Sequence, residues 1–292
     1  MKKISRYTIY AIIAFIASLI YNYGCSRGCS HHKATSQTAL SPTIVETKNS
    51  LTEDYNHPKI SPTDFSEVGI VDKVEGLPEI ILTRKSYIVS YNPESRCPNW
   101  VAWRLTSSHT SGDVSRMGNA FHEDLDVPEP RALNADFRES GYSRGHMCPA
   151  GDNKWDRDAM YETFLLSNIC PQNANLNSGV WNQIEMSCRQ WAEKYGDVYI
   201  ICGPMYFKSN ERLFIGYNQI AVPDAFFKVI LCLNGTPKAI GYICRNTDGN
   251  RKKDQYINTL AQVERLTGLH FFPKLDSEKR TLVESNADIN EW

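Results

Sequence analysis

Residues 143–152 read SRGHMCPAGD, a stretch that carries an arginine, a histidine and a cysteine among two glycines and a proline. Glycine and proline are poor helix formers, so these polar side chains are expected in a loop. The unperturbed pKa of a histidine, roughly 6.5, suits His146 to act as a general base at neutral pH. Three interpretations are open: a catalytic loop, a fragment of a metal site, and a structural turn. Cys148 would also allow a thiol nucleophile, although export of the chain would favour a disulfide instead.

An asparagine-rich block follows at residues 168–177, NICPQNANLN, directly before a predicted helix. Asn177 has two explanations: its side-chain oxygen caps the helix, or it provides a neutral oxygen ligand for Mg²⁺. In the helix predicted over 178–194, Glu185 and Arg189 stand four residues apart on one flank of the apolar stripe. Taken alone, such a pair is an ordinary surface pair worth roughly a few tenths of a kcal/mol.

Strands and helices are mixed along the rest of the chain. Runs rich in aromatic and β-branched residues predict three strands and a hairpin, at residues 86–92, 100–106, 198–202, 226–233 and 238–244. Apolar residues at helical spacing predict two helices, over 178–194 and 254–266. Because the order shows no regular βαβ alternation, we predict an α+β fold with a mixed, mainly antiparallel sheet.

Composition limits how the chain can bind a polyanion. Its 292 residues are 41% hydrophobic, which is enough for a sizeable core. The formal net charge is -1, so no overall positive field attracts nucleic acid. A polyanion would have to be bound by a local basic cluster or through a metal ion.

The N-terminus predicts export. Lys2, Lys3 and Arg6 precede an apolar run at 7–23, a pattern typical of a signal peptide or an uncleaved anchor over 1–24. Cys25 follows Gly24, which suggests a lipidated N-terminal cysteine, with simple cleavage as the alternative. We therefore expect a periplasmic, secreted or membrane-anchored protein. Residues 25–62 are polar and without periodicity, so they are expected to form a flexible tether.

The chain has nine cysteines, and in an oxidising compartment some of them should pair. Cys25 and Cys29 precede His31 and His32, a spacing that resembles a zinc site. The surrounding segment is polar and offers no second ligand pair, so we do not expect zinc there.

Taken together, these segments resemble the DNA/RNA non-specific endonucleases. The family signature is Asp-Arg-Gly-His, then Ser-Asn-x-x-Pro-Gln some 20 to 30 residues later, then Asn, Trp and Glu on a helix. The matching stretches are 143–150 (SRGHMCPA) and 166–172 (LSNICPQ), followed by Asn177, Trp181 and Glu185. Arg189 matches a further family arginine. The similarity covers roughly residues 65 to 275, and its several ordered blocks make it more specific than a lone motif.

The resemblance implies a ββα-metal (His-Me) finger that hydrolyses phosphodiester bonds in DNA and RNA. His146 would be the general base, and Asn177 the single protein ligand to one Mg²⁺, with Mn²⁺ or another divalent ion as alternatives. Glu185 would hold a water of that ion. Arg144 and Arg189 would bind phosphate and stabilise its developing charge. Arg116 matches, at looser spacing, a further substrate-binding arginine.

One residue departs from the family signature. Ser143 stands where the family has aspartate, so it keeps a hydrogen-bonding group but lacks the charge. The alternative function is therefore an exported nucleic-acid-binding protein with an impaired nuclease site. The resemblance sets an endonuclease domain at 63–275 and a C-terminal tail at 276–292. Cys148 and Cys170 lie in the two segments that would flank the site, and a disulfide between them is a hypothesis.

Overall fold

The computed structural model describes residues 60–292, except 117, 119, 210 and 248–250. The chain divides into two units, Met1–Tyr55 and Asn56–Trp292, and the fold is that of the second. The predicted signal peptide, tether and lipidated Cys25, and the rejected zinc site, lie outside the described residues. Within 60–292, apart from the gaps, no helix has the length and apolar character needed to cross a membrane.

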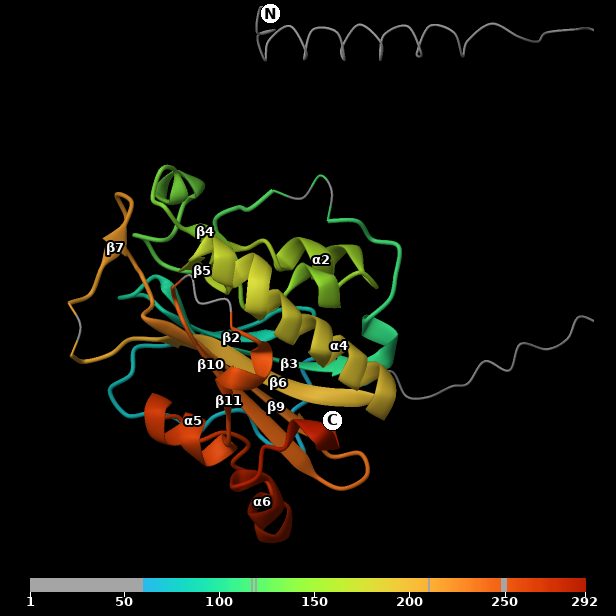
Figure 1. Cartoon of the computed structure of the whole chain (residues 1–292). Helices are drawn as coiled ribbons and strands as arrows, with labels where there is room; N and C mark the ends of the chain where they lie inside the picture. The colour runs from blue at the N-terminus through green and yellow to red at the C-terminus, as the bar shows by residue number, and fades with distance from the viewer. Residues whose placement is uncertain (1–59, 117, 119, 210, 248–250) are drawn as a thin grey trace, which may run out of the picture. The chain divides into compact units, whose positions relative to one another are not determined.

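A seven-stranded antiparallel sheet forms the centre of the fold, in the order β1-β2-β3-β6-β9-β10-β11 (Figure 1). Its strands are Ile80–Thr83 (β1), Ile88–Asn92 (β2), Cys97–Thr106 (β3), Asp197–Met205 (β6), Ala225–Cys232 (β9), Lys238–Arg245 (β10) and Ile257–Asn258 (β11). The predicted strands and the hairpin correspond to β2, β3, β6, β9 and β10. Together with the helices, this sheet confirms the predicted α+β class.

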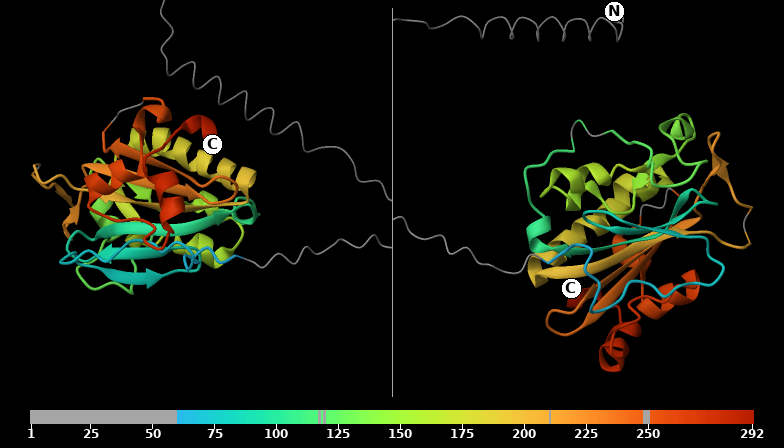
Figure 2. Two further views of the ribbon diagram at one scale, coloured as in Figure 1. Left: turned by 90° about the horizontal axis from the view of Figure 1, so that it is seen from below. Right: turned by 180° about the vertical axis from the view of Figure 1, so that it is seen from behind.

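Helices cover both faces of the sheet (Figures 1 and 2). Helix α4, Asn182–Tyr195, packs on β3 and β6. On the opposite face α5, Leu260–Thr267, packs on β9 and β10, and α6, Ser277–Glu284, packs on β10. Residues 276–292, expected as a tail, therefore pack against the sheet domain. A sheet covered on both faces explains why every residue of β6 and β9 is buried.

The functional segment is a separate two-stranded sheet followed by a helix. Strand β4, Ser143–His146, pairs antiparallel with β5, Ile169–Gln172. The short helix α2, Arg157–Glu162, lies between them in the chain. After β5 come the helical turn α3, Ala174–Leu176, and a kinked turn, Asn177–Trp181, which leads into α4. The kink lies at Gly179, whose φ of −95° and ψ of −114° are not helical. This order of strand, strand and helix is the predicted ββα unit. A second small sheet pairs β7, Phe214–Ile215, with β8, Ile220–Ala221.

The helix boundaries reflect local capping. Helix α4 ends at Gly196, whose φ of 93° is accessible to glycine at little cost. Helix α5 begins later than predicted, because the Thr259 side chain caps it and residues 257–258 pair with β10 as β11. The predicted start at residue 254 is therefore wrong.

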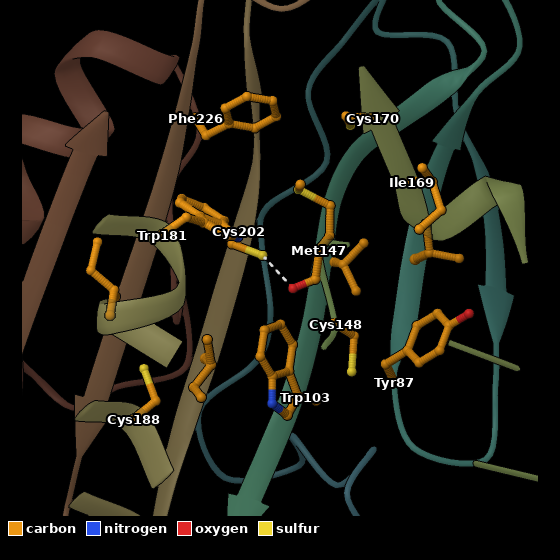
Figure 3. Packing of buried hydrophobic residues seen from close by; sticks show 14 of the residues in the cluster. Tyr87, Trp103, Met147, Cys148, Ile169, Cys170, Trp181, Cys188, Cys202 and Phe226 are labelled. Carbon is orange, nitrogen blue, oxygen red and sulfur yellow. Dashed lines mark hydrogen bonds between the residues drawn. The ribbon is translucent and has the colours of Figure 1, made fainter. Parts of the chain in front are cut away.

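The seven described cysteines are free and buried, so the predicted disulfides are wrong for this part of the chain. The register of β4 and β5 places Cys170 opposite Gly145, not opposite Cys148. Figure 3 shows the two side chains apart in the core. There Cys202 donates to the carbonyl of Met147 at 3.4 Å and ties the segment after β4 to the central sheet (Figure 3).

Candidate active site

A cleft of about 1070 Å³ opens where β4, the start of α4 and the loop at residues 112–116 meet. Its lining brings together all six residues that the sequence singled out, although they are spread over more than 70 positions. These residues are Arg116, Arg144, His146, Asn177, Glu185 and Arg189. The cleft therefore combines an imidazole, a carboxylate, an amide and three guanidinium groups.

His146 is the last residue of β4, and aromatic rings fix its side chain. The ring centroids of Phe121 and Phe164 each lie 5.1 Å from that of the imidazole. Burial, aided by the charge of Arg116, lowers the pKa of His146 to about 3. The imidazole is therefore neutral at physiological pH. Its Nε2 atom is buried and has no hydrogen-bond partner among the described residues.

The segment after His146 is held by a buried amide that sequence reasoning left without a role. The Asn168 side chain accepts from the Cys148 amide at 2.9 Å and donates to the Cys148 and Thr163 carbonyls, also at 2.9 Å. Trp181 donates from its indole to the His146 carbonyl at 3.4 Å. Cys148 itself is fully buried, and burial raises the pKa of its thiol well above the usual value, which argues against a thiol nucleophile.

Arg144 is oriented without a carboxylate. Its Nη2 donates to the Asn134 carbonyl at 3.1 Å, and its guanidinium lies 5.4 Å from the Phe121 ring centroid and 5.2 Å from that of Phe137. Burial, and the nearby charge of Arg138, lower the pKa of Arg144. No salt bridge joins Arg144 to an acidic residue in the described part of the chain, so its charge is available to an anion in the cleft.

Arg189 pairs with a buried carboxylate from a distant segment. Its Nη1 donates to Asp152 at 2.8 Å, and Trp103 donates to the other carboxylate oxygen at 3.1 Å. Asp152 is 2% exposed. The chain passes close to this pair at Gly151, where an added Cβ would lie 2.9 Å from the Arg189 guanidinium. The expected Glu185–Arg189 surface pair does not form as a salt bridge, because Arg189 bonds to Asp152 instead.

Asn177 does not cap the helix. Asn173 takes that role, since its side chain accepts from the amides of Asn175 and Leu176 at 2.9 and 3.2 Å. Asn177 lies one turn later, at the start of the kinked turn, and lines the cleft. The capping explanation is therefore wrong.

Glu185 faces the cleft from the first turn of α4. Burial raises the pKa of its carboxyl to about 7. Nearby Asp152 adds to this rise, while Lys228, Arg189 and Arg116 oppose it. The carboxyl thus titrates near neutral pH.

Two charged residues near the cleft were given no role from the sequence. Asp152 ends the stretch quoted at the outset, and Lys228 is the one charged residue in the strand AFFKVILC. A lysine within an otherwise apolar strand was a usable signal, because lysine is almost never fully buried without a partner.

Known proteins share this arrangement. The family model for DNA/RNA non-specific endonucleases matches residues 71–278. The mitochondrial nuclease EXOG of Xenopus laevis is 35% identical over 77% of this chain and 68% of its own length. Mitochondrial endonuclease G of Homo sapiens is 34% identical over 68% of this chain and 72% of its own. For human EXOG the match spans 56% of the relative's length, so this chain covers little more than half of that protein.

A solved structure of the EndoG/EndoGI complex, described as showing the mechanism of EndoG inhibition, superposes with a TM-score of 0.67 at 30% identity. The match covers 73% of this chain and 94% of the chain in that structure. The predicted export is contradicted, because these curated relatives are mitochondrial nucleases. The family match extends over most of the described residues and includes the ββα unit, the cleft and the central sheet. The chain belongs to the DNA/RNA non-specific endonuclease family.

Proposed function

We propose that the chain is a nuclease that hydrolyses phosphodiester bonds in DNA and RNA with the help of one divalent cation. The observation that carries the proposal is the neutral imidazole of His146, whose Nε2 lacks a partner, in a cleft shared with three guanidinium groups. Phosphodiester hydrolysis needs an activated water and charge stabilisation on the phosphate. These side chains are suited to both tasks.

His146 is proposed to accept a proton from the attacking water at Nε2. A neutral imidazole is the form that can accept a proton, and burial maintains this form at physiological pH. The hydrogen bonds of Asn168 around Cys148 hold the following loop in place, so the imidazole needs little reorganisation before reaction.

Arg144, Arg189 and Arg116 are proposed to bind the phosphate. Guanidinium groups present paired donors that match phosphate oxygens, and their charge opposes the negative charge that develops during reaction. Their positive charge is confined to the cleft, which explains how a chain of net charge -1 could act on a polyanion. Because such contacts reach phosphate rather than base edges, we expect little sequence preference.

The donor set suits a hydrated, oxygen-preferring cation. Within the described residues no cluster of three or more His, Cys, Asp or Glu side chains could hold a metal. Asn177 would supply one amide oxygen and Glu185 would accept from a water of the ion, an arrangement that fits Mg²⁺ or Mn²⁺, since Mg²⁺ keeps several waters. When bound, such an ion would act as a Lewis acid on the phosphate and the leaving oxygen. The nuclease unit is proposed to span 63–275, with 276–292 packed against it.

Digestion of plasmid DNA and of RNA with Mg²⁺, with EDTA as the control, tests the proposal. We expect cleavage of both, and a loss of at least about 100-fold in His146→Ala. His270→Ala is a matched control, because that histidine lies outside the cleft, with its Nδ1 3.1 Å from Oε1 of Glu264. Wild-type activity in His146→Ala would refute the mechanism. Binding without cleavage across several divalent metals would instead support the impaired site suggested by Ser143.

A further inference from the structure

Lys228 is a fully buried lysine whose ammonium makes no hydrogen bond to the described residues. It lies mid-strand in β9, opposite Cys202 of β6 and Tyr242 of β10. Its Nζ is 4.5 Å from the ring centroid of Trp181 and 5.1 Å from that of Trp103. Burying an ammonium is costly unless other charges compensate for the lost water.

The compensating charges lie on the cleft side of the sheet. Burial opposes the charge of Lys228, yet four surrounding groups together hold its pKa above the usual value. Those groups are Cys202 of β6, Glu185 and Cys188 of α4, and Asp152 of the turn after β4. The two thiols have pKa values raised to about 12 and are neutral, so the two carboxylates carry the opposing charge.

Two cations, Lys228 and Arg189, thus lie near the carboxyl groups of Glu185 and Asp152. Removing Lys228 alone would leave Asp152 and Glu185 close together, with Arg189 already bonded to Asp152. Two neighbouring buried carboxylates cannot easily both remain ionised.

We propose that Lys228 is a positioning residue of the nuclease site: it is the buried counter-charge of Asp152 and Glu185, held against the Trp103 indole that donates to Asp152. Through Asp152 it also supports Arg189, and the two tryptophan rings fix the place of its ammonium. This inference rests on the proposed function. A role in packing alone would not require a charge, since the rest of the strand is apolar and methionine would fill a similar volume.

The test compares Lys228→Met, Glu185→Gln and the double variant in the full chain. Lys238→Met is the matched control, because Lys238 lies on the adjacent strand outside the cleft and bonds to the Glu291 carbonyl. We expect Lys228→Met to lower kcat for DNA cleavage at least about tenfold. KM should change less than about threefold, because Arg144 and Arg116 still bind phosphate. The double variant should lie within about threefold of Glu185→Gln, because both changes remove one function.

A second readout needs no metal and no activity. In urea unfolding with EDTA, Glu185→Gln should raise the midpoint more in the Lys228→Met background than in the wild type, because the unbalanced carboxylate is then absent. If Lys228→Met alone does not fold, recovery of folding in the double variant supports the charge pairing, and no recovery overturns it.

Unchanged kcat in a folded Lys228→Met protein would overturn the inference. The inference would also be overturned if the losses in kcat of the two single variants added up in the double variant and the unfolding midpoints showed no coupling between the two changes. If the wild type fails to cleave nucleic acid, the proposed function fails. The unfolding midpoints of the wild type, the two single variants and the double variant still decide whether the charge of Lys228 compensates for that of Glu185.

Discussion

Replacing Glu185 with glutamine is expected to stabilise the fold while impairing cleavage. Glutamine has nearly the same shape and carries no charge, so the change isolates the cost of an ionised carboxylate at the cleft floor. Burial and Asp152 raise the pKa of Glu185 from 4.5 to about 7. The folded state therefore binds a proton more tightly than the unfolded state does.

The sign of the effect follows from this difference. Below pH 4.5 the carboxyl is protonated in both states and costs nothing. Between pH 4.5 and about 7 the unfolded chain releases the proton first, so the free energy of unfolding falls as pH rises. At about 1.4 kcal/mol per pH unit, this interval sets an upper limit of about 3 kcal/mol. Water in the open cleft reduces it, and we expect about 1–3 kcal/mol.

Urea unfolding of both proteins without divalent metal, at pH 4, 6 and 8, measures this quantity. We expect Glu185→Gln to be more stable than the wild type at pH 8, with the advantage shrinking at pH 6 and absent at pH 4. Equal or lower stability of the variant at pH 8 would refute the reasoning. If the stability advantage of the variant did not change with pH, its cause would be better packing and not the removal of a charge.

Three further predictions concern the segments around the cleft. Ser143→Asp should change the cleavage rate by less than about threefold, because Arg144 is already held by Asn134 and two aromatic rings; a tenfold gain would show that Arg144 lacks support. Asn173→Ala should lower the free energy of unfolding by about 1 kcal/mol in urea, because it removes a helix cap. Cys148 and Cys170 should both react with a thiol reagent in denaturant without reductant, and protection of either one would contradict the free thiols.

Local patterns along the chain were enough to predict much of the fold. The apolar runs of β6, β9 and β10 and the stripe of α4 depend on near neighbours, and the structure has these elements close to their predicted bounds. The family resemblance selected six residues that the structure brings into one cleft. The predictions of strands and helices succeed because burial patterns are encoded over short stretches of the chain.

Interactions expected between neighbouring residues did not form where a residue from another segment took the place of one of them. Glu185 and Arg189 are four residues apart, yet Arg189 pairs with Asp152, 37 residues earlier, because folding brings that buried carboxylate within 2.8 Å of the guanidinium. Asn177 had an available capping role, but Asn173, nearer the true start of the helix, took it. Cys148 and Cys170 lie in adjacent segments whose strand register keeps them from pairing.

By itself, then, the sequence determined the α+β class, the ββα unit and the set of residues that face the cleft. Only the tertiary structure decided which charges meet, which cysteines stay free, and that Lys228 is buried near Glu185 and Asp152. The physical reason is that hydrophobic periodicity is a local property of the chain, whereas electrostatic partners are selected by distances between segments that only folding brings together.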